Sequence, residues 1–205
     1  MAPWLEEFPH LRKLTVEREE LRFHDWREWG EESPSQRFGI DFTRSSLDHF
    51  ILSKLAPSLP GDAADSIVIN VRRGDYYSNP GHLARYGWDI EGYLVEALQI
   101  ARPAARALIV SDDPGWCRDH VDALVRSVVP VVDYAEADPI GNFRTIASAK
   151  CLIGTNSTFS YWGGYVSSTR FESSEVIMPR FHARFDEGTD AYQLDPTWTV
   201  IDGHY

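Results

Sequence analysis

The run Ser66-Ile67-Val68-Ile69-Asn70-Val71 is followed directly by Arg72-Arg73-Gly74-Asp75. A short apolar run rich in β-branched residues is typical of a buried β-strand, and the charged residues after it mark the strand's end. Side chains along a strand alternate between its two faces, so Asn70 and Arg72 are expected on one face and Val71 and Arg73 on the other. This pattern predicts a core strand that ends in two arginines pointing in opposite directions.

Further strands and helices alternate after this first strand. Apolar β-branched runs predict strands over 107–110, 128–132, 151–154 and 175–178. Residues with helical spacing or helix-capping signals predict helices over 89–101, from 113 to 125, from 138 to 147 and from 156 or 157 to about 167. Because strands that alternate with helices form βαβ units, the fold class is α/β: a Rossmann-like parallel sheet of about five strands with flanking helices.

The first part of the chain has a different pattern. Residues 1–40 are predicted to be a short irregular segment, with a linker over 31–35, and residues 41–205 to be the Rossmann-like domain. Within the second range, the amphipathic pattern over 45–56, with Ser45 or Ser46 as the cap and Pro57 as the stop, predicts a helix that packs on the sheet.

Composition narrows the class of protein. The 205 residues carry a formal net charge of -11, which argues against nucleic acid and against an anionic membrane surface as partners. No apolar run approaches the roughly 18 residues that a membrane span needs. Cys117 and Cys151 lie in apolar stretches without metal-binding or redox spacing, so both are predicted to be free buried thiols. We therefore expect a cytoplasmic protein.

The end of the first strand offers a positive charge for a ligand. Two adjacent arginines repel each other unless each has an anionic partner. One arrangement has Arg72 reaching a diphosphate and Arg73 pairing with an internal acid such as Asp75. The alternative is a solvated basic turn, and this motif by itself does not decide between them.

The end of the second strand carries Ser111-Asp112-Asp113-Pro114. Asp113 is in the position of a helix cap. Asp112 is free to bind a ribose hydroxyl or a metal. However, adjacent aspartates point in different directions and no third ligand is evident, so we predict no metal site.

A third polar strand end is Gly154-Thr155-Asn156-Ser157-Thr158-Phe159. Backbone N–H groups and the helix dipole at such a strand-to-helix junction favour a phosphate. The alternative is a strongly specified helix cap whose following aromatic residues belong to the core. The glycine-lysine signature of P-loop ATPases does not occur in this sequence.

In this order the motifs resemble those of the α-1,2-fucosyltransferases of glycosyltransferase family 11. That family has His-x-Arg-Arg-Gly-Asp-Tyr, Ser-Asp-Asp-x-x-Trp and Asn-Ser-x-Phe-Ser-Trp-Trp-Gly. The corresponding segments here are Asn70–Tyr76, Ser111–Trp116 and Asn156–Gly163, and Ala137-Asp138-Pro139 also matches. The resemblance covers residues 40–180 and implies the C-terminal, donor-binding half of a two-domain GT-B glycosyltransferase.

The resemblance also implies a reaction: inverting, metal-independent transfer of L-fucose from GDP-fucose to a glycan hydroxyl in α-1,2 linkage, without a cofactor. Arg72 is then the catalytic residue, binding the β-phosphate of the departing GDP. Ser157 and Thr158 would bind the same phosphates, and Asp112 and Asp138 would lie near the guanosine. The full set of residues expected around the donor is Asn70, Arg72, Arg73, Asp75, Ser111, Asp112, Asp138, Asn156, Ser157, Thr158 and Phe159.

The sequence departs from the family pattern in two places. Asn70 replaces the family's histidine, and the Gly-Gly-Leu-Gly-Asn-Gln loop of the family's N-terminal domain does not occur, so residues 1–40 resemble a remnant of the acceptor domain. A fucosyltransferase is then expected either to be complete with a minimal N-terminal part or to be completed by an oligomeric partner, and the alternative function is a non-catalytic nucleotide-sugar-binding module or subunit. His82, His120 and His182 are candidates for a catalytic base by residue type, with His182 favoured by its place after the last predicted strand.

Overall fold

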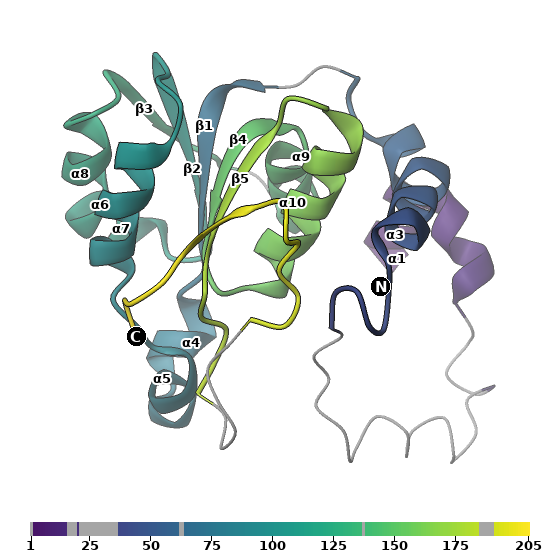
Figure 1. Cartoon of the computed structure of the whole chain (residues 1–205), viewed down its shortest axis with the longest axis horizontal. Helices are drawn as coiled ribbons and strands as arrows, with labels where there is room; N and C mark the ends of the chain where they lie inside the picture. The colour runs from purple at the N-terminus through teal and green to yellow at the C-terminus, as the bar shows by residue number, and fades with distance from the viewer. Residues whose placement is uncertain (1, 16–19, 21–36, 62–63, 137, 185–190) are drawn as a thin grey trace.

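The computed structural model describes residues 2–15, 20, 37–61, 64–136, 138–184 and 191–205. Its centre is a six-stranded sheet with the order β3-β2-β1-β4-β5-β6, in which every neighbouring pair is parallel (Figure 1). The strands are β1 (Ala64–Val71), β2 (Arg106–Ser111), β3 (Val131–Tyr134), β4 (Ala149–Gly154), β5 (Glu175–Pro179) and β6 (Thr199–Ile201). The α/β prediction is confirmed, but the expected number of strands was one too few, because β6 was not predicted.

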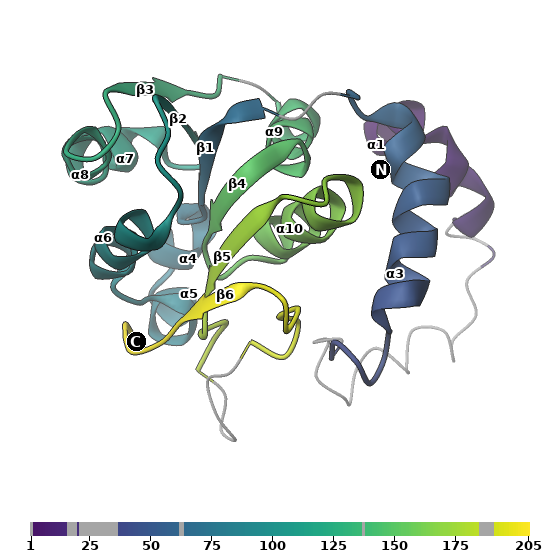
Figure 2. The same ribbon diagram turned by 45° about the horizontal axis from the view of Figure 1, so that its top comes forward.

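Helices cover both faces of this sheet (Figures 1 and 2). One face carries α6 (Ile90–Ile100), α7 (Pro114–His120) and α8 (Asp122–Arg126). The other carries α9 (Pro139–Ala147) and α10 (Thr158–Arg170). Two short helices, α4 (Gly74–Ser78) and α5 (Pro80–Tyr86), lie beyond the end of β1, at the bottom of Figure 1.

The alternation along β1 separates two hydrophobic cores. Ile67, Ile69 and Val71 pack with α6, α7 and α8, whereas Val68 packs with α9 and α10. β1 pairs on one side with β2 and on the other with β4, so both of its edges and both of its faces are covered. A strand buried on all sides explains why the consecutive residues Ile67, Val68 and Ile69 are all apolar.

Two element boundaries differ from the sequence prediction for local reasons. The helix expected over 113–125 is divided at Val121 into α7 and α8. The third strand begins after Pro130 rather than before it, since proline has no N–H to donate to a neighbouring strand, and β3 is an edge strand of the sheet.

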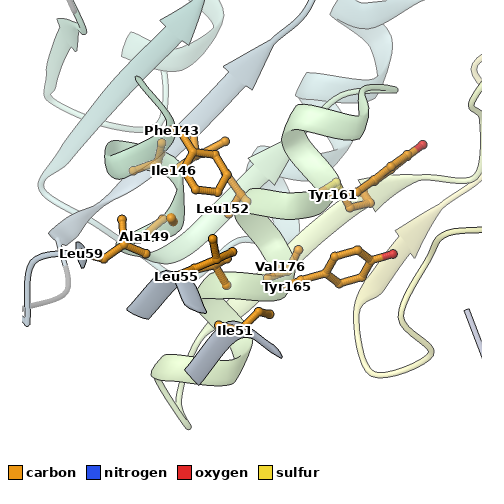
Figure 3. Close-up of a cluster of buried hydrophobic side chains, with 14 of the residues drawn as sticks. Ile51, Leu55, Leu59, Phe143, Ile146, Ala149, Leu152, Tyr161, Tyr165 and Val176 are labelled. Carbon is orange, nitrogen blue, oxygen red and sulfur yellow. The ribbon is translucent and has the colours of Figure 1, made fainter. Parts of the chain in front are cut away.

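The amphipathic helix before β1 places Leu47, Ile51 and Leu55 in the same core as one face of the sheet, as expected. It consists of α3 (Arg44–Phe50) and a wider π-type continuation, η3 (Ile51–Leu55), and it packs against α10 and against η1 (Pro9–Leu14). Thr43, not Ser45 or Ser46, is its N-cap, in a capping box with Ser46. Figure 3 shows Ile51, Leu55 and Leu59 among side chains of α9, α10 and the sheet.

The sequence predicted an irregular N-terminal segment. Residues 2–14 instead form α1 (Ala2–Glu7) and η1. Phe8, between them, is buried and contacts the rings of Trp4 and Phe143. The predicted linker 31–35 lies outside the described residues. Within the described part of the chain, no helix has both the length and the apolar character needed to cross a membrane.

Candidate functional site

The strand order creates a switch point between β1 and β4. β2 lies beside β1, and β3 lies beside β2 at the edge of the sheet. The next strand in the chain, β4, lies on the other side of β1. The connections after β1 and β4 therefore leave the sheet in opposite directions, and ligands of open parallel sheets bind in the crevice between such connections. Arg72 follows β1 and Thr155-Asn156-Ser157 follow β4, so the switch point brings together the first and third polar strand ends.

Arg72 lies at this switch point and keeps a partly exposed guanidinium. Its backbone N–H donates to the hydroxyl of Thr155 over 2.9 Å. Its Nη1 is 2.6 Å from Oδ2 of Asp112, its Nη2 is 2.5 Å from Oδ1 of Asp75, and its side chain is 37% exposed. Charge-assisted hydrogen bonds of this kind hold the planar guanidinium in one orientation while leaving part of it open to solvent.

Asp112 is the second component of the cluster. Besides its ion pair with Arg72, it accepts a hydrogen bond over 2.8 Å from the backbone N–H of Arg73. A Cβ atom on Gly74 would come within 2.4 Å of Oδ2 of Asp112, so a larger residue at position 74 would displace this carboxylate. Gly74 thus leaves the space that the Asp112 carboxylate occupies after the end of β2.

Arg73 is held inside the structure on the opposite face, as strand alternation predicted. Its guanidinium carbon lies 3.9 Å from the ring centre of Tyr77 and 4.1 Å from that of Trp116. Its acidic partner is Asp113, at 3.2 Å, whereas Asp75 pairs with Arg72, so the suggested Arg73–Asp75 pair was wrong. Its side chain is only 17% exposed, which suits a residue that fastens α4 and α7 to the sheet.

Asn70 is buried and its amide is satisfied within the chain. Its Nδ2 donates to the carbonyl of Val110 over 3.1 Å, and its Oδ1 accepts from the hydroxyl of Ser160 over 2.7 Å. One donor and one acceptor are also what a neutral imidazole offers, so asparagine can make the same type of link between β1, β2 and α10. Direct contact between Asn70 and a nucleotide-sugar substrate stays a prediction.

Asn156 and Ser157 form the junction between β4 and α10. The amide of Asn156 is fully used: it donates to the carbonyls of Tyr86 and His182 and accepts from Nε1 of Trp88. Ser157 caps α10 by accepting from the N–H of Phe159 over 3.1 Å, which leaves its own O–H as a donor. Asn156 therefore holds the surrounding loops together at the start of α10.

The other predicted site residues lie around this edge of the sheet. Thr158, the first residue of α10, is exposed, while Phe159 is half-buried against Phe143. Ser111 accepts a hydrogen bond from the backbone N–H of Asp113. Asp138 is exposed and caps α9 by accepting from the N–H of Gly141. The structure joins Arg72, Asp75 and Asp112 directly, and it places Asp138 and Phe159 at the starts of α9 and α10.

Sequence reasoning missed other residues that shape the site. Thr155 is fully buried and positions the backbone of Arg72 from a site 83 residues further along the chain. Tyr76 and Tyr86 stack with ring centres 4.3 Å apart, and the guanidinium of Arg72 lies 5.3 Å from the Tyr76 ring. The second tyrosine of the pair comes from α5, which the sequence pattern did not predict.

The three histidines proposed as bases have different surroundings. His182 lies against the rings of Tyr86 and Tyr161, and its Nδ1 is 3.2 Å from the Tyr161 hydroxyl. Burial, assisted by Arg85, lowers the pKa of His182 to about 4, so its ring is neutral at pH 7 and only weakly basic. His82 lies beside Tyr86 with Nδ1 3.2 Å from the carbonyl of Asp75, and His120 stacks on Trp116.

Neither metal-ligand clusters nor reactive thiols occur in the described residues. No group of three or more histidine, cysteine, aspartate or glutamate side chains is arranged there to bind a metal ion. Cys117 and Cys151 are free and buried, as predicted, and burial raises their pKa values to about 11 and about 12. Both thiols are therefore protonated and unreactive at neutral pH.

Comparison with known proteins agrees with the motif pattern. The sequence model of glycosyl transferase family 11 matches residues 7–202. Galactoside alpha-(1,2)-fucosyltransferase 1 of Lagothrix lagotricha is 31% identical over 121 residues, which cover 57% of this chain and 33% of the relative. The protein of the same name from Ateles belzebuth is 30% identical over the same shares, and that from Saimiri sciureus is 30% identical over 104 residues, 49% of this chain and 28% of the relative.

The aligned region thus spans about a third of the length of these relatives. The family model, in contrast, covers nearly the whole chain, including η1, the sheet and all three polar strand ends. On the extent of that match, the chain belongs to glycosyl transferase family 11.

Proposed function

We propose that the chain binds GDP-fucose at the switch point between β1 and β4 and acts as an inverting fucosyltransferase on a galactoside hydroxyl, forming an α-1,2 linkage. One observation carries the proposal: Arg72, the arginine of the family motif, presents a fixed and partly exposed guanidinium at the place where open parallel sheets bind nucleotides. The names of the matched relatives supply the galactoside and the linkage.

The diphosphate in this proposal lies between Arg72 and the first turn of α10. Arg72 contacts the β-phosphate, Ser157 donates its free O–H, and Thr158 contributes its exposed hydroxyl. The unpaired N–H groups and the positive end of the 13-residue helix α10 add to the attraction. Asp112 and Asp138 are proposed to lie toward the guanosine.

The reaction follows from this placement. The acceptor oxygen forms a bond to C1 of fucose while the bond between C1 and the β-phosphate oxygen breaks, and the electron pair leaves with GDP. The acceptor proton passes to a base or to solvent. Arg72 and the N–H groups of α10 stabilise the negative charge that builds up on the leaving diphosphate. We propose that these groups make a metal ion unnecessary.

The test is titration calorimetry with GDP, GDP-fucose, UDP and ADP, combined with an assay of GDP release in the presence of a β-galactoside. We expect GDP and GDP-fucose to bind best, and Arg72→Ala to weaken GDP binding about 100-fold, because a charge-assisted contact to phosphate is lost. Arg106→Ala is the matched control, since Arg106 begins β2 at the opposite edge of the sheet. Absence of GDP binding by the unmodified chain would refute the proposal. Binding without fucose transfer would instead indicate a non-catalytic module.

A further inference from the structure

The Arg72 cluster, made up of Arg72, Asp75 and Asp112, carries more negative than positive charge. One guanidinium is paired with two carboxylates, at 2.5 Å from Nη2 to Asp75 and at 2.6 Å from Nη1 to Asp112. The neighbouring Arg73 does not compensate, because its own charge is paired with Asp113. A diphosphate that approaches Arg72 therefore meets a net negative cluster, and both carboxylates repel it.

Asp75 holds the nitrogen of Arg72 that a phosphate needs. A guanidinium binds a phosphate through two parallel N–H bonds, either from Nη1 and Nη2 or from Nε and Nη2, because the remaining side of Nη1 is next to Cδ. Both arrangements include Nη2, which lies 2.5 Å from Oδ1 of Asp75. A two-bond contact between Arg72 and a β-phosphate therefore competes with Asp75 for the same nitrogen.

Asp112, the other carboxylate of the cluster, is fixed by more than its contact with Arg72. Its Oδ1 accepts a hydrogen bond over 2.8 Å from the backbone N–H of Arg73. Its Oδ2 lies where a Cβ atom on Gly74 would approach to 2.4 Å, so the carboxylate occupies a fitted space beside the backbone. Its side chain is 28% exposed. Asp112 is therefore expected to stay on Nη1 and to keep the guanidinium oriented when a ligand binds.

Asp75 is held much less firmly. Its side chain is 55% exposed, and among the residues that the structure describes, Arg72 is the only hydrogen-bond partner of its carboxylate. It belongs to the five-residue helix α4, which has no buried residue and no side-chain cap. Rotation of the Asp75 side chain into solvent would leave no buried group unpaired, and an exposed ion pair of this kind contributes little to stability.

From this difference, and on the basis of the proposed GDP-fucose site, we infer that Asp75 is a displaceable counter-ion that takes the place of the donor's β-phosphate on Arg72, whereas Asp112 is a positioning residue that stays. When the donor binds, the Asp75 carboxylate turns into solvent and the β-phosphate takes over Nη2. After fucose transfer, the return of Asp75 to Arg72 competes with GDP and so favours its release.

The experiment compares GDP with GMP by titration calorimetry, in EDTA and again with Mg²⁺. GMP lacks the β-phosphate, so it reports the effect of a substitution on the rest of the nucleotide site. We expect Asp75→Asn to lower the Kd for GDP about fivefold and to leave the Kd for GMP nearly unchanged, because the exposed ion pair no longer competes with the β-phosphate. Asp75→Ala should have the same effect, since the lost carboxylate is the cause.

The second aspartate should respond in the opposite direction. Asp112→Asn is expected to raise the Kd for GDP about fivefold, because Arg72 loses the partner that orients it. Asp119→Asn is the matched control: Asp119 is an exposed residue of α7, so the variant loses the same charge, and it is not among the ion-pair partners that the structure gives Arg72. Circular dichroism shows whether each variant is folded, and the Asp75 variants decide the matter if Asp112→Asn is not.

A Kd for GDP that stays the same or rises in both Asp75 variants would overturn the inference, while GDP binding by the unmodified chain would leave the proposed function standing. Equal tightening by Asp75→Asn and Asp112→Asn would also overturn it, because the effect would then be one of charge alone. GDP binding that requires Mg²⁺ and is lost in Asp75→Asn would show that the carboxylates hold a cation instead. If neither the unmodified chain nor any variant binds GDP, the proposed function fails and the inference fails with it.

Discussion

Arg72 and Arg73 leave β1 on opposite faces, and their surroundings differ accordingly. Arg72 is held by two carboxylates at the edge of a solvent-accessible switch point, whereas Arg73 lies between two aromatic rings and pairs with Asp113. The first arrangement leaves part of the Arg72 side chain exposed at the switch point. The second uses the charge to connect β1, α4 and α7.

Arg73→Ala is expected to lower the free energy of unfolding by about 2–3 kcal/mol, because it removes cation–π contacts with Tyr77 and Trp116 and leaves Asp113 without its ion-pair partner. Urea denaturation followed by circular dichroism measures this loss. GDP binding by the folded variant should stay close to that of the unmodified chain. Loss of GDP binding with unchanged stability would show that the two arginines have the opposite roles.

Sequence reasoning identified the face of each arginine but not all of its partners. Strand alternation is a local property, so it correctly separated Arg72 from Arg73. The choice of Asp75 or Asp113 as the partner of Arg73 depends on where α7 lies, and the contact of Arg72 with Thr155 spans 83 residues. Contacts between residues that are far apart in the sequence depend on how the strands and helices pack. A local sequence pattern contains no information on that packing.

At the scale of elements, α10 packs closely because of two adjacent glycines. A Cβ on Gly163 would lie 2.6 Å from Cδ1, 2.7 Å from Cγ1 and 3.1 Å from Cβ of the buried Ile146 in α9. A Cβ on Gly164 would lie 2.9 Å from the ring of Trp198. The glycines allow α10 to approach α9 on one side and the C-terminal segment on the other.

Gly163→Ala is expected to destabilise the protein by about 1–2 kcal/mol, although alanine favours a helix by about 1 kcal/mol over glycine, since the methyl group overlaps several atoms of Ile146. Thermal or urea denaturation gives the difference. Gly115→Ala is the matched control: in α7 the added Cβ meets only Oδ1 of Asp113, at 3.9 Å, so that variant should be as stable as the unmodified chain or more so. Equal effects of the two substitutions would contradict this account of α10.

The pattern of elements was largely predictable from β1 to β5, because each is an apolar run between clear capping or turn residues. β6 was missed: Thr199–Ile201 is short, has one exposed and one half-exposed residue, and is a strand only because β5 lies beside it. The division between α7 and α8 and the short helices α4 and α5 also lack a strong periodic signal. The position of α3 depended on the outer surfaces of α9 and α10, which exist only after folding.

At the scale of the whole molecule, the first and last parts of the chain join the same core. Phe8 is 1% exposed and belongs to the core formed by α9, α10 and one face of the sheet. Arg44 at the start of α3 pairs at 2.7 Å with the buried Asp195 of the C-terminal segment. The N-terminal helices therefore form an outer layer that is bonded to the rest of the structure (Figure 2).

Phe8→Ala is expected to lower the free energy of unfolding by about 3–5 kcal/mol, because it removes a fully buried ring that contacts Trp4 and Phe143. Leu14→Ala, at a residue that is 58% exposed, should change it by less than about 0.5 kcal/mol. Urea denaturation monitored by both fluorescence and circular dichroism should give a single transition for each variant. A loss below about 1 kcal/mol for Phe8→Ala would show that the N-terminal layer is not part of the cooperative unit.

The position of β1 also bears on how the chain is made. Ile67 pairs with Cys151, so one edge of this central apolar strand has no partner until β4 has left the ribosome, more than 80 residues later. An unpaired apolar edge invites association with other chains, and parallel pairings between distant residues form slowly. Newly made β1 is therefore the segment of this chain most exposed to association before β4 is synthesised, and Thr155, which holds the backbone of Arg72, is also absent until then.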